Sequence, residues 1–120
     1  EALSYAQERK QFGKPISNFQ SIQFMLADMA MNIEAARLLV HKSVYLLQQG
    51  KPSATSASFA KCFAADTAVK VASDAVQIHG GYGYIREYAV EKYYRDAKIM
   101  QIYEGTNQIQ RVVIAKEILR

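Results

Sequence analysis

The feature that most constrains the fold is a pair of long helical patterns separated by a very short connection. Apolar side chains recur every three or four residues across residues 18–49, which is typical of an amphipathic helix. Gly50 and Pro52 end this pattern, and a second helix is predicted over residues 53–79, with alanines recurring along one face. Because the connection is so short, the two helices must fold back on each other as an antiparallel hairpin. The positions of the first helix that are predicted to lie in the core are Phe19, Ile22, Met25, Met29, Ile33, Ala36, Val40, Val44 and Leu47.

Shorter helical patterns flank this hairpin. Residues 2–11 are predicted to be the end of a helix, a short helix is predicted over residues 87–98, and a last one over residues 106–119, with Thr106 as its N-cap. No strand, repeat or low-complexity tract is predicted. The chain is therefore expected to be a single all-α domain over residues 1–120, an antiparallel four-helix bundle with short loops.

The composition argues against several classes of function. With 50% apolar and 22% charged residues among 120, the chain has the balance of an ordinary globular domain. The net charge of +4 comes from 15 basic and 11 acidic residues that are interspersed, so no nucleic-acid surface is predicted. No apolar run approaches the roughly 20 residues that a membrane-spanning helix needs. The single cysteine, Cys62, excludes an internal disulfide, and neither His41 nor His79 has a second ligand at metal spacing, so no metal site is predicted.

Three stretches concentrate polar groups at loops and helix ends, where functional sites tend to gather. They read ERKQFGKPI from Glu8, QIHGGYGY from Gln77 and RDAKIMQIYEGTNQIQR from Arg95. Taken singly, their residues have ordinary explanations: Glu104 would be a solvated loop acid and Arg9 a surface arginine. Taken together, in this order and spacing, the three stretches resemble the acyl-CoA dehydrogenase family, and more narrowly its C-terminal helical domain, over essentially the whole chain.

The resemblance implies a flavoenzyme longer than this chain, with an N-terminal helical domain and a middle β domain before the bundle. A start at Glu1, without a methionine and inside a predicted helix, gives the same expectation of a piece of a longer polypeptide. Members of the family bind FAD and oxidise acyl-CoA thioesters to trans-2-enoyl thioesters, in fatty acid β-oxidation or branched-chain degradation. Their electrons leave through an electron-transferring flavoprotein. The resemblance implies a homotetramer or a dimer, located in the cytoplasm of a bacterium or in the mitochondrial matrix of a eukaryote.

The resemblance places Glu104 at the position of the catalytic base, which removes the α-proton of the thioester while the β-hydrogen leaves as hydride to the flavin. A thioester α-proton is a very weak acid, and a carboxylate in water is a poor base for it. Removal from water disfavours the charged form of a carboxylate and so strengthens it as a base. In the family, the backbone N–H of the base and a ribityl hydroxyl of FAD bind the thioester carbonyl, as in an oxyanion hole. Gly105 is implied to leave space beside the bound substrate.

The resemblance also implies a set of cofactor contacts. Arg9 would reach the FAD pyrophosphate of a neighbouring subunit, and the turn at residues 77–81 would wrap the adenine-ribose end, where missing side chains let the cofactor lie on the backbone. Because these stretches would serve different copies of the flavin, oligomerisation would be part of the site. The implied FAD contacts are Arg9, Gln11, Phe12, Gln20, Gln77, Ile78, His79, Gly80, Gly81, Thr106, Asn107 and Gln108.

Two alternatives to a dehydrogenase stay open at this point. An acyl-CoA oxidase shares the base chemistry but passes electrons to oxygen, so hydrogen peroxide on turnover would indicate it. A non-catalytic helical interaction module would use the same bundle to bind partners or nucleic acid, and salt-sensitive DNA binding would indicate it. Arg95 and Asp96 are expected to form a structural ion pair. Because the resemblance implies that the domains holding most of the acyl-CoA pocket and the flavin ring lie outside this chain, the isolated 120 residues are expected to have no dehydrogenase activity and little affinity for FAD.

Overall fold

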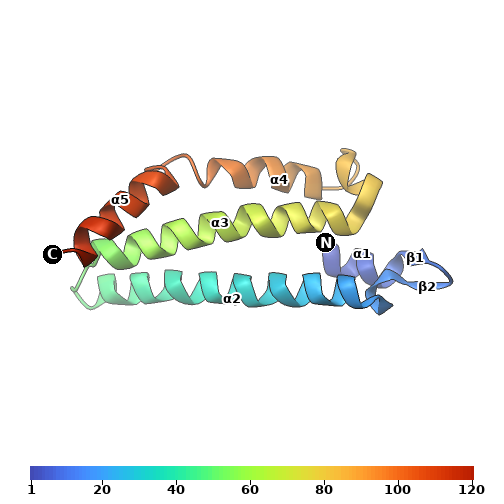
Figure 1. Cartoon of the computed structure of the whole chain (residues 1–120), viewed down its shortest axis with the longest axis horizontal. Helices are drawn as coiled ribbons and strands as arrows, with labels where there is room; N and C mark the ends of the chain where they lie inside the picture. The colour runs from blue at the N-terminus through green and yellow to red at the C-terminus, as the bar shows by residue number, and fades with distance from the viewer.

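The structure, a computed structural model, describes all of residues 1–120 and is built almost entirely from helices (Figure 1). Its elements are α1 (Ala2–Glu8), β1 (Lys10–Gln11), β2 (Lys14–Pro15), the 3-10 helix η1 (Ile16–Asn18), α2 (Gln20–Gln48), α3 (Ala54–His79), the 3-10 helix η2 (Gly80–Tyr84), α4 (Val90–Ile99) and α5 (Asn107–Ile118). Helices α2 and α3 form a long antiparallel pair, and α4 and α5 follow one another along the side of α3 that faces away from α2. The molecule is elongated and measures 58 × 25 × 23 Å. None of its helices combines the length and the apolar character needed to cross a membrane.

Helix α3 is the central element, since it packs against α1, α2, α4 and α5. Its buried positions carry mostly small side chains, among them Ala60, Cys62, Ala65 and Ala72. Small side chains let neighbouring helix axes come close, which allows one helix to be shared by several others. The all-α class is confirmed. The predicted count of four helices is approximate, because the chain has five α-helices and the short α4 and α5 together cover one side of α3.

The helix boundaries follow from capping side chains and from glycine. At the start of α3, Ser53 Oγ accepts a hydrogen bond of 3.1 Å from the backbone N–H of Ser56. At the start of α5, Thr106 Oγ1 accepts one of 3.2 Å from the backbone N–H of Ile109, so the N-cap predicted at Thr106 is confirmed. Helix α3 ends at Gly80, whose φ of 61° lies in the left-handed region that stops a helix.

The prediction that the chain contains no strand is wrong at one point. Lys10–Gln11 and Lys14–Pro15 pair as a small antiparallel hairpin after α1, which ends at Glu8, earlier than predicted. The turn between the strands holds Phe12 and Gly13 at φ values of 52° and 77°, which are typical of tight hairpin turns. Strands of two residues are too short to show an alternation of apolar and polar side chains, so periodicity could not reveal them.

The apolar stripe of α2 is covered only in part. Met29 and Ala36 are buried, whereas Ile33, Val44 and Leu47 are 39%, 46% and 64% exposed. The hydrophobic core concentrates where α1, η1, the start of α2 and the end of α3 meet. The C-terminal half of α2 packs chiefly on α3 (Figure 1). The prediction that the whole stripe lies in the core is therefore wrong for Ile33, Val40, Val44 and Leu47.

The ion pair predicted between Arg95 and Asp96 does not form. Arg95 pairs with Glu91 at 3.1 Å, and Asp96 pairs with Lys92 at 3.1 Å, each across one turn of α4. Consecutive residues point in different directions on a helix, whereas residues four apart share a face. The four side chains therefore form two separate surface pairs.

Candidate functional site

A pocket of about 450 Å³ lies at the end of the bundle where α1, the hairpin and η2 meet. Its lining contains residues of the first and the second polar stretch, which are far apart in the sequence. Six predicted cofactor contacts lie in its lining, namely Arg9, Gln11, Ile78, His79, Gly80 and Gly81. The lining is completed by Tyr5, Ile16, Tyr82 and Ile85. We call it the Arg9 pocket.

One wall of the Arg9 pocket is a rigid aromatic contact. The Tyr5 ring stacks on His79 with 4.1 Å between the ring centroids, and the Tyr5 hydroxyl donates to the His79 carbonyl oxygen at 3.3 Å. Burial raises the pKa of the Tyr5 phenol, so the hydroxyl remains a donor at neutral pH. The His79 residue is 3% exposed, and its Nδ1 lies 2.8 Å from the carbonyl oxygen of Ala75. His79 is thus fixed as part of the wall.

Arg9 supplies the positive charge of the pocket. Its guanidinium carbon lies 5.2 Å from the centroid of the Tyr82 ring, which is a cation–π arrangement. None of the six ion pairs in the chain involves Arg9. Beside it, Gly80 and Gly81 leave open space where a side chain would otherwise stand. The pocket can therefore take an anionic group next to bare backbone and a flat ring.

Three of the predicted cofactor contacts lie on other exposed surface. Phe12, at the hairpin tip, is 90% exposed and meets Phe19 edge to face with 6.1 Å between the ring centroids. Gln77 lines a different pocket, of about 560 Å³, together with Tyr84. Gln20 is exposed at the first residue of α2. The structure therefore gathers only part of the predicted FAD set into one place.

Glu104 lies in the loop between α4 and α5. The residue is exposed, and its φ of 52° is left-handed, as is the 84° of Gly105. Glu104 and Phe12 are the two non-glycine residues with positive φ, and both fall in stretches predicted to be functional. A side chain other than glycine is kept in this region only where its surroundings fix it, and such positions cluster at functional sites.

Gly105 and Gln110 close the loop on its inner side. Gln110 Nε2 donates to the Glu104 carbonyl oxygen at 3.2 Å. A Cβ added at Gly105 would come within 2.9 Å of that same nitrogen. A larger residue at position 105 would therefore be strained by its φ, and it would displace the Gln110 amide from this hydrogen bond.

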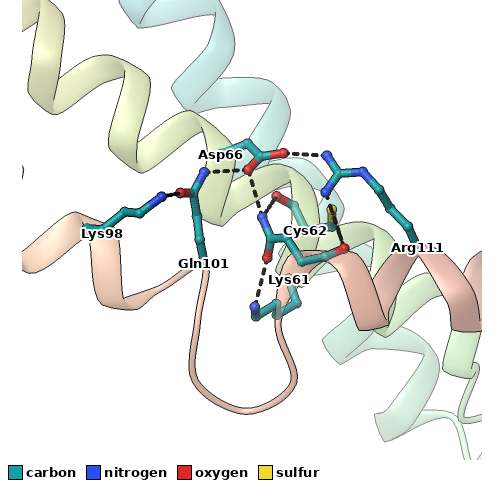
Figure 2. Close-up of polar contacts among 7 residues, drawn as sticks. Lys61, Cys62, Asp66, Lys98, Gln101 and Arg111 are labelled. Carbon is teal, nitrogen blue, oxygen red and sulfur yellow. Dashed lines mark hydrogen bonds and ion pairs between the residues drawn. The ribbon is translucent and has the colours of Figure 1, made fainter.

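A network of polar side chains that the sequence did not predict ties this loop to α3 (Figure 2). Asp66 Oδ1 accepts hydrogen bonds of 2.7 Å from the side-chain amides of both Gln101 and Asn107, which stand at the two ends of the loop. Its Oδ2 accepts one of 2.7 Å from Arg111. Burial raises the pKa of the Asp66 carboxyl, but the hydrogen bonds from Arg111, Gln101 and Asn107 outweigh burial and lower the pKa overall. Asp66 therefore holds the loop as an ionised group at neutral pH.

The side chain of Asn107 faces into the bundle, although it is predicted as a cofactor contact. The residue is 3% exposed, and its amide nitrogen donates to the carbonyl oxygen of Cys62 at 3.2 Å as well as to Asp66. Its Oδ1 accepts a hydrogen bond of 2.8 Å from Lys61, whose Nζ also donates to the Gly105 carbonyl oxygen at 2.7 Å. The side chain of Asn107 is therefore engaged within the chain, and its geometry favours an anchor for the loop.

Apart from Phe12, Gln20 and Gln77, the predicted site residues fall into two groups on one chain. One group surrounds the Arg9 pocket, and the other surrounds the loop of Glu104, with Gln108 exposed at the start of α5. The stretch of α3 between the two groups, from Cys62 to Ile78, is roughly 24 Å long. The first group offers a binding place for an anion, and the second presents a carboxylate that can accept a proton.

Known proteins match this chain over its whole length. The family model described as acyl-CoA dehydrogenase, C-terminal domain, matches residues 1–119. The chain is 56% identical over 120 residues to the probable acyl-CoA dehydrogenase FadE25 of Mycobacterium tuberculosis, covering 99% of this chain and 31% of that protein. It is 52% identical over 120 residues to the caffeyl-CoA reductase-Etf complex subunit CarC of Acetobacterium woodii, covering 100% of this chain and 32% of that protein.

A solved structure gives the same result for the fold. The butyryl-CoA dehydrogenase of Megasphaera elsdenii superposes with a TM-score of 0.98 at 55% sequence identity, covering 99% of this chain and 31% of that one. The chain thus spans about a third of the length of the relatives it matches. The chain belongs to the acyl-CoA dehydrogenase family, and it corresponds to the C-terminal domain of that family.

Proposed function

We propose that this chain is the C-terminal helical domain of a longer FAD-dependent acyl-CoA dehydrogenase, in which Glu104 is the catalytic base. The observation that carries the proposal is the loop of Glu104, which presents an exposed carboxylate on a left-handed backbone braced from α3. The relatives named as acyl-CoA dehydrogenases support the type of reaction. The position of Glu104 in the third polar stretch supports its role.

In the proposed reaction, Glu104 accepts the proton from the carbon next to the thioester carbonyl and ends the step protonated. Bound FAD would supply an acceptor for the β-hydrogen and its electron pair, which would complete the conversion of the acyl-CoA to a trans-2-enoyl-CoA. The backbone N–H of Glu104 donates to no backbone acceptor within the chain. It is available to the thioester carbonyl oxygen, where a donor stabilises the charge that develops as the proton leaves.

The Arg9 pocket fits the nucleotide end of FAD. Arg9 is a cation without an ion-pair partner, and guanidinium groups bind phosphate oxygens in a fork geometry. Gly80 and Gly81 leave the backbone open to a flat ligand. The proposed cofactor contacts are Arg9, Gln11, Phe12, Gln20, Gln77, Ile78, His79, Gly80, Gly81, Thr106 and Gln108, and the proposed substrate contact is Gly105.

The proposed assembly is a homo-oligomer, either a tetramer or a dimer. The roughly 24 Å of α3 between the Arg9 pocket and the Glu104 loop support the idea that the two serve different copies of the flavin. Monomeric proteins rarely expose large apolar patches, and α2 exposes many apolar side chains that further protein could cover. They include Phe24, Met31, Leu38, Tyr45 and Leu47.

The proposed electron acceptor is an electron-transferring flavoprotein. The relative CarC is named as a subunit of a complex with such a protein, which supports this partner. The relatives reported above come from bacteria, which supports a cytoplasmic location if the host is bacterial.

The proposed base is tested by Glu104→Gln in the full-length polypeptide, with Glu87→Gln, another exposed loop acid, as the matched control. The amide keeps the size of the side chain but cannot accept the proton. FAD content and acyl-CoA binding should be retained, while the rate of flavin bleaching by substrate should fall by at least about a hundredfold. A rate of bleaching equal to that of Glu87→Gln would refute the assignment.

A second candidate is the same step run in reverse, as an enoyl-CoA reductase. The relative named caffeyl-CoA reductase, at 52% identity, favours this alternative. To distinguish the dehydrogenase from the reductase, turnover is measured in both directions. An electron-transferring flavoprotein serves as the redox partner, and acyl-CoA or aryl-acrylyl-CoA serves as the substrate. Hydrogen peroxide formed in proportion to turnover would point instead to an acyl-CoA oxidase.

A further inference from the structure

We propose that Asp66 is a positioning residue for catalysis, which holds the loop that presents Glu104 in its reactive conformation. The proposal rests on the assignment of Glu104 as the base. Asp66 lies on α3 and does not belong to any of the three polar stretches that carry the family resemblance.

One carboxylate fixes both ends of the loop. Gln101 lies near the start of the loop and Asn107 directly follows it, and both side-chain amides donate to Asp66 Oδ1 at 2.7 Å (Figure 2). The backbone N–H of Asn107 also donates to the Gln101 carbonyl oxygen at 3.0 Å, so the two ends meet. Because the carboxylate is a shared acceptor, loss of its charge weakens the hold on both ends at once.

Lys61 adds a second clamp inside the loop. Its Nζ donates to Asn107 Oδ1 at 2.8 Å and to the Gly105 carbonyl oxygen at 2.7 Å. The Gly105 carbonyl belongs to the residue directly after Glu104. Lys61 and Asp66 together therefore fix the backbone on both sides of the base from one helix.

The catalytic consequence follows from the demands of proton transfer. The carboxylate of a base must lie in a near-attack position, and a misplacement of about 1 Å can cost about a hundredfold in rate. The left-handed φ of 52° at Glu104 is a conformation that the chain does not adopt without constraint. Loss of the clamp is therefore expected to slow proton abstraction while the binding groups of the Arg9 pocket stay in place.

The test compares Asp66→Asn with Asp74→Asn in the full-length, FAD-loaded protein. Both aspartates lie on α3 and pair with a basic side chain, but Asp74 pairs with Lys70 at 2.6 Å and has no hydrogen bond to the loop. Asp66→Asn should lower the limiting rate constant for flavin reduction by about ten- to a hundredfold at saturating acyl-CoA. FAD content and the dissociation constant for acyl-CoA should match those of Asp74→Asn, and the isotope effect with α-deuterated substrate should increase.

Lys61→Met provides a second test of the positioning role if Asp66→Asn does not fold. It should also slow flavin reduction at saturating substrate with unchanged FAD content, since the Gly105 carbonyl loses its partner. The proposal is overturned if the folded variants reduce flavin as fast as Asp74→Asn, or if their loss of rate only follows a loss of bound FAD.

The Glu104→Gln variant separates this proposal from the proposed function. If Glu104→Gln is inactive and Asp66→Asn reduces flavin at the normal rate, only the positioning role of Asp66 is wrong. If Glu104→Gln reduces flavin at the normal rate, the base assignment fails and the positioning role fails with it.

Discussion

The ammonium group of Lys61 lies 2.7 Å from the carbonyl oxygen of Gly105 and donates a hydrogen bond that joins α3 to the loop carrying Glu104. The two residues are 44 positions apart in the sequence. The conformation of the loop is therefore set by the helix behind it, in addition to the local turn residues. This arrangement makes α3 the scaffold for the proposed base.

Arg9 is predicted to contribute the main electrostatic contact to the cofactor. Arg9→Met should weaken FAD binding by about ten- to a hundredfold, because a hydrogen bond to a charged group contributes about 1.5–3 kcal/mol. Lys10→Met is the matched control, since Lys10 is the next residue but does not line the pocket. Titration of FAD into the FAD-free full-length protein measures the dissociation constant for each variant. Equal affinities for FAD in the two variants would contradict the role of Arg9.

Gly83 is predicted to be required for the packing of η2 on α3. A Cβ at this position would lie 2.5 Å from the carbonyl oxygen of Val76 and 2.9 Å from the Cβ of His79. Gly83→Ala should therefore lower the free energy of unfolding by about 1–3 kcal/mol through overpacking. Gly81→Ala, where nothing lies within 4 Å of an added Cβ, should change it much less. Urea unfolding of the FAD-free protein makes the comparison, and similar losses in both variants would argue against this close approach.

Thr106 is predicted to stabilise the start of α5. Its Oγ1 accepts from the backbone N–H of Ile109 at 3.2 Å. Thr106→Ala should lower the free energy of unfolding by about 1 kcal/mol, while Thr106→Ser should retain most of it because serine keeps the acceptor. Unfolding curves of the FAD-free protein measure the difference. Equal stability of the two variants would show that the cap contributes nothing.

Asp66 is predicted to make the stability depend on pH in the acidic range. Its folded-state pKa is lowered, since hydrogen bonds from Arg111, Gln101 and Asn107 outweigh the effect of burial. Stability from a lowered carboxyl pKa is present above the unfolded-state value of about 3.9 and is lost as the pH falls through the folded-state pKa. The difference in free energy of unfolding between wild type and Asp66→Asn should therefore shrink below about pH 4. A difference that stays constant from neutral to acidic pH would contradict the pairing.

The helices could be predicted from the sequence because their signals are local. The apolar period of α2 and the Gly50–Pro52 break place the long hairpin to within two residues. Thr106 marks the start of α5 because an N-cap acts over only three residues. The two-residue strands around Phe12 carry no such pattern, so the sequence does not predict them.

The candidate site was predictable only in part. Arg9, Gly80 and Glu104 stand in stretches whose combined spacing points to the family. The Asp66 network could not be found in this way, because its partners Gln101, Asn107 and Arg111 lie 35, 41 and 45 positions away. Periodicity shows which face a residue occupies but not which distant polar group meets it. An acidic residue in the otherwise alanine-rich middle of α3 is the only sequence signal that points to it.

If Glu104 is the base, its carboxylate must face the reacting carbon of a bound acyl-CoA. The most direct measurement is the distance from its carboxylate to the α-carbon of a bound acyl-CoA in a structure of the full-length, FAD-loaded protein. One carboxylate oxygen is expected to lie within about 3–3.5 Å of that carbon in a cavity closed to water. A carboxylate that points into solvent, away from the thioester, would contradict it.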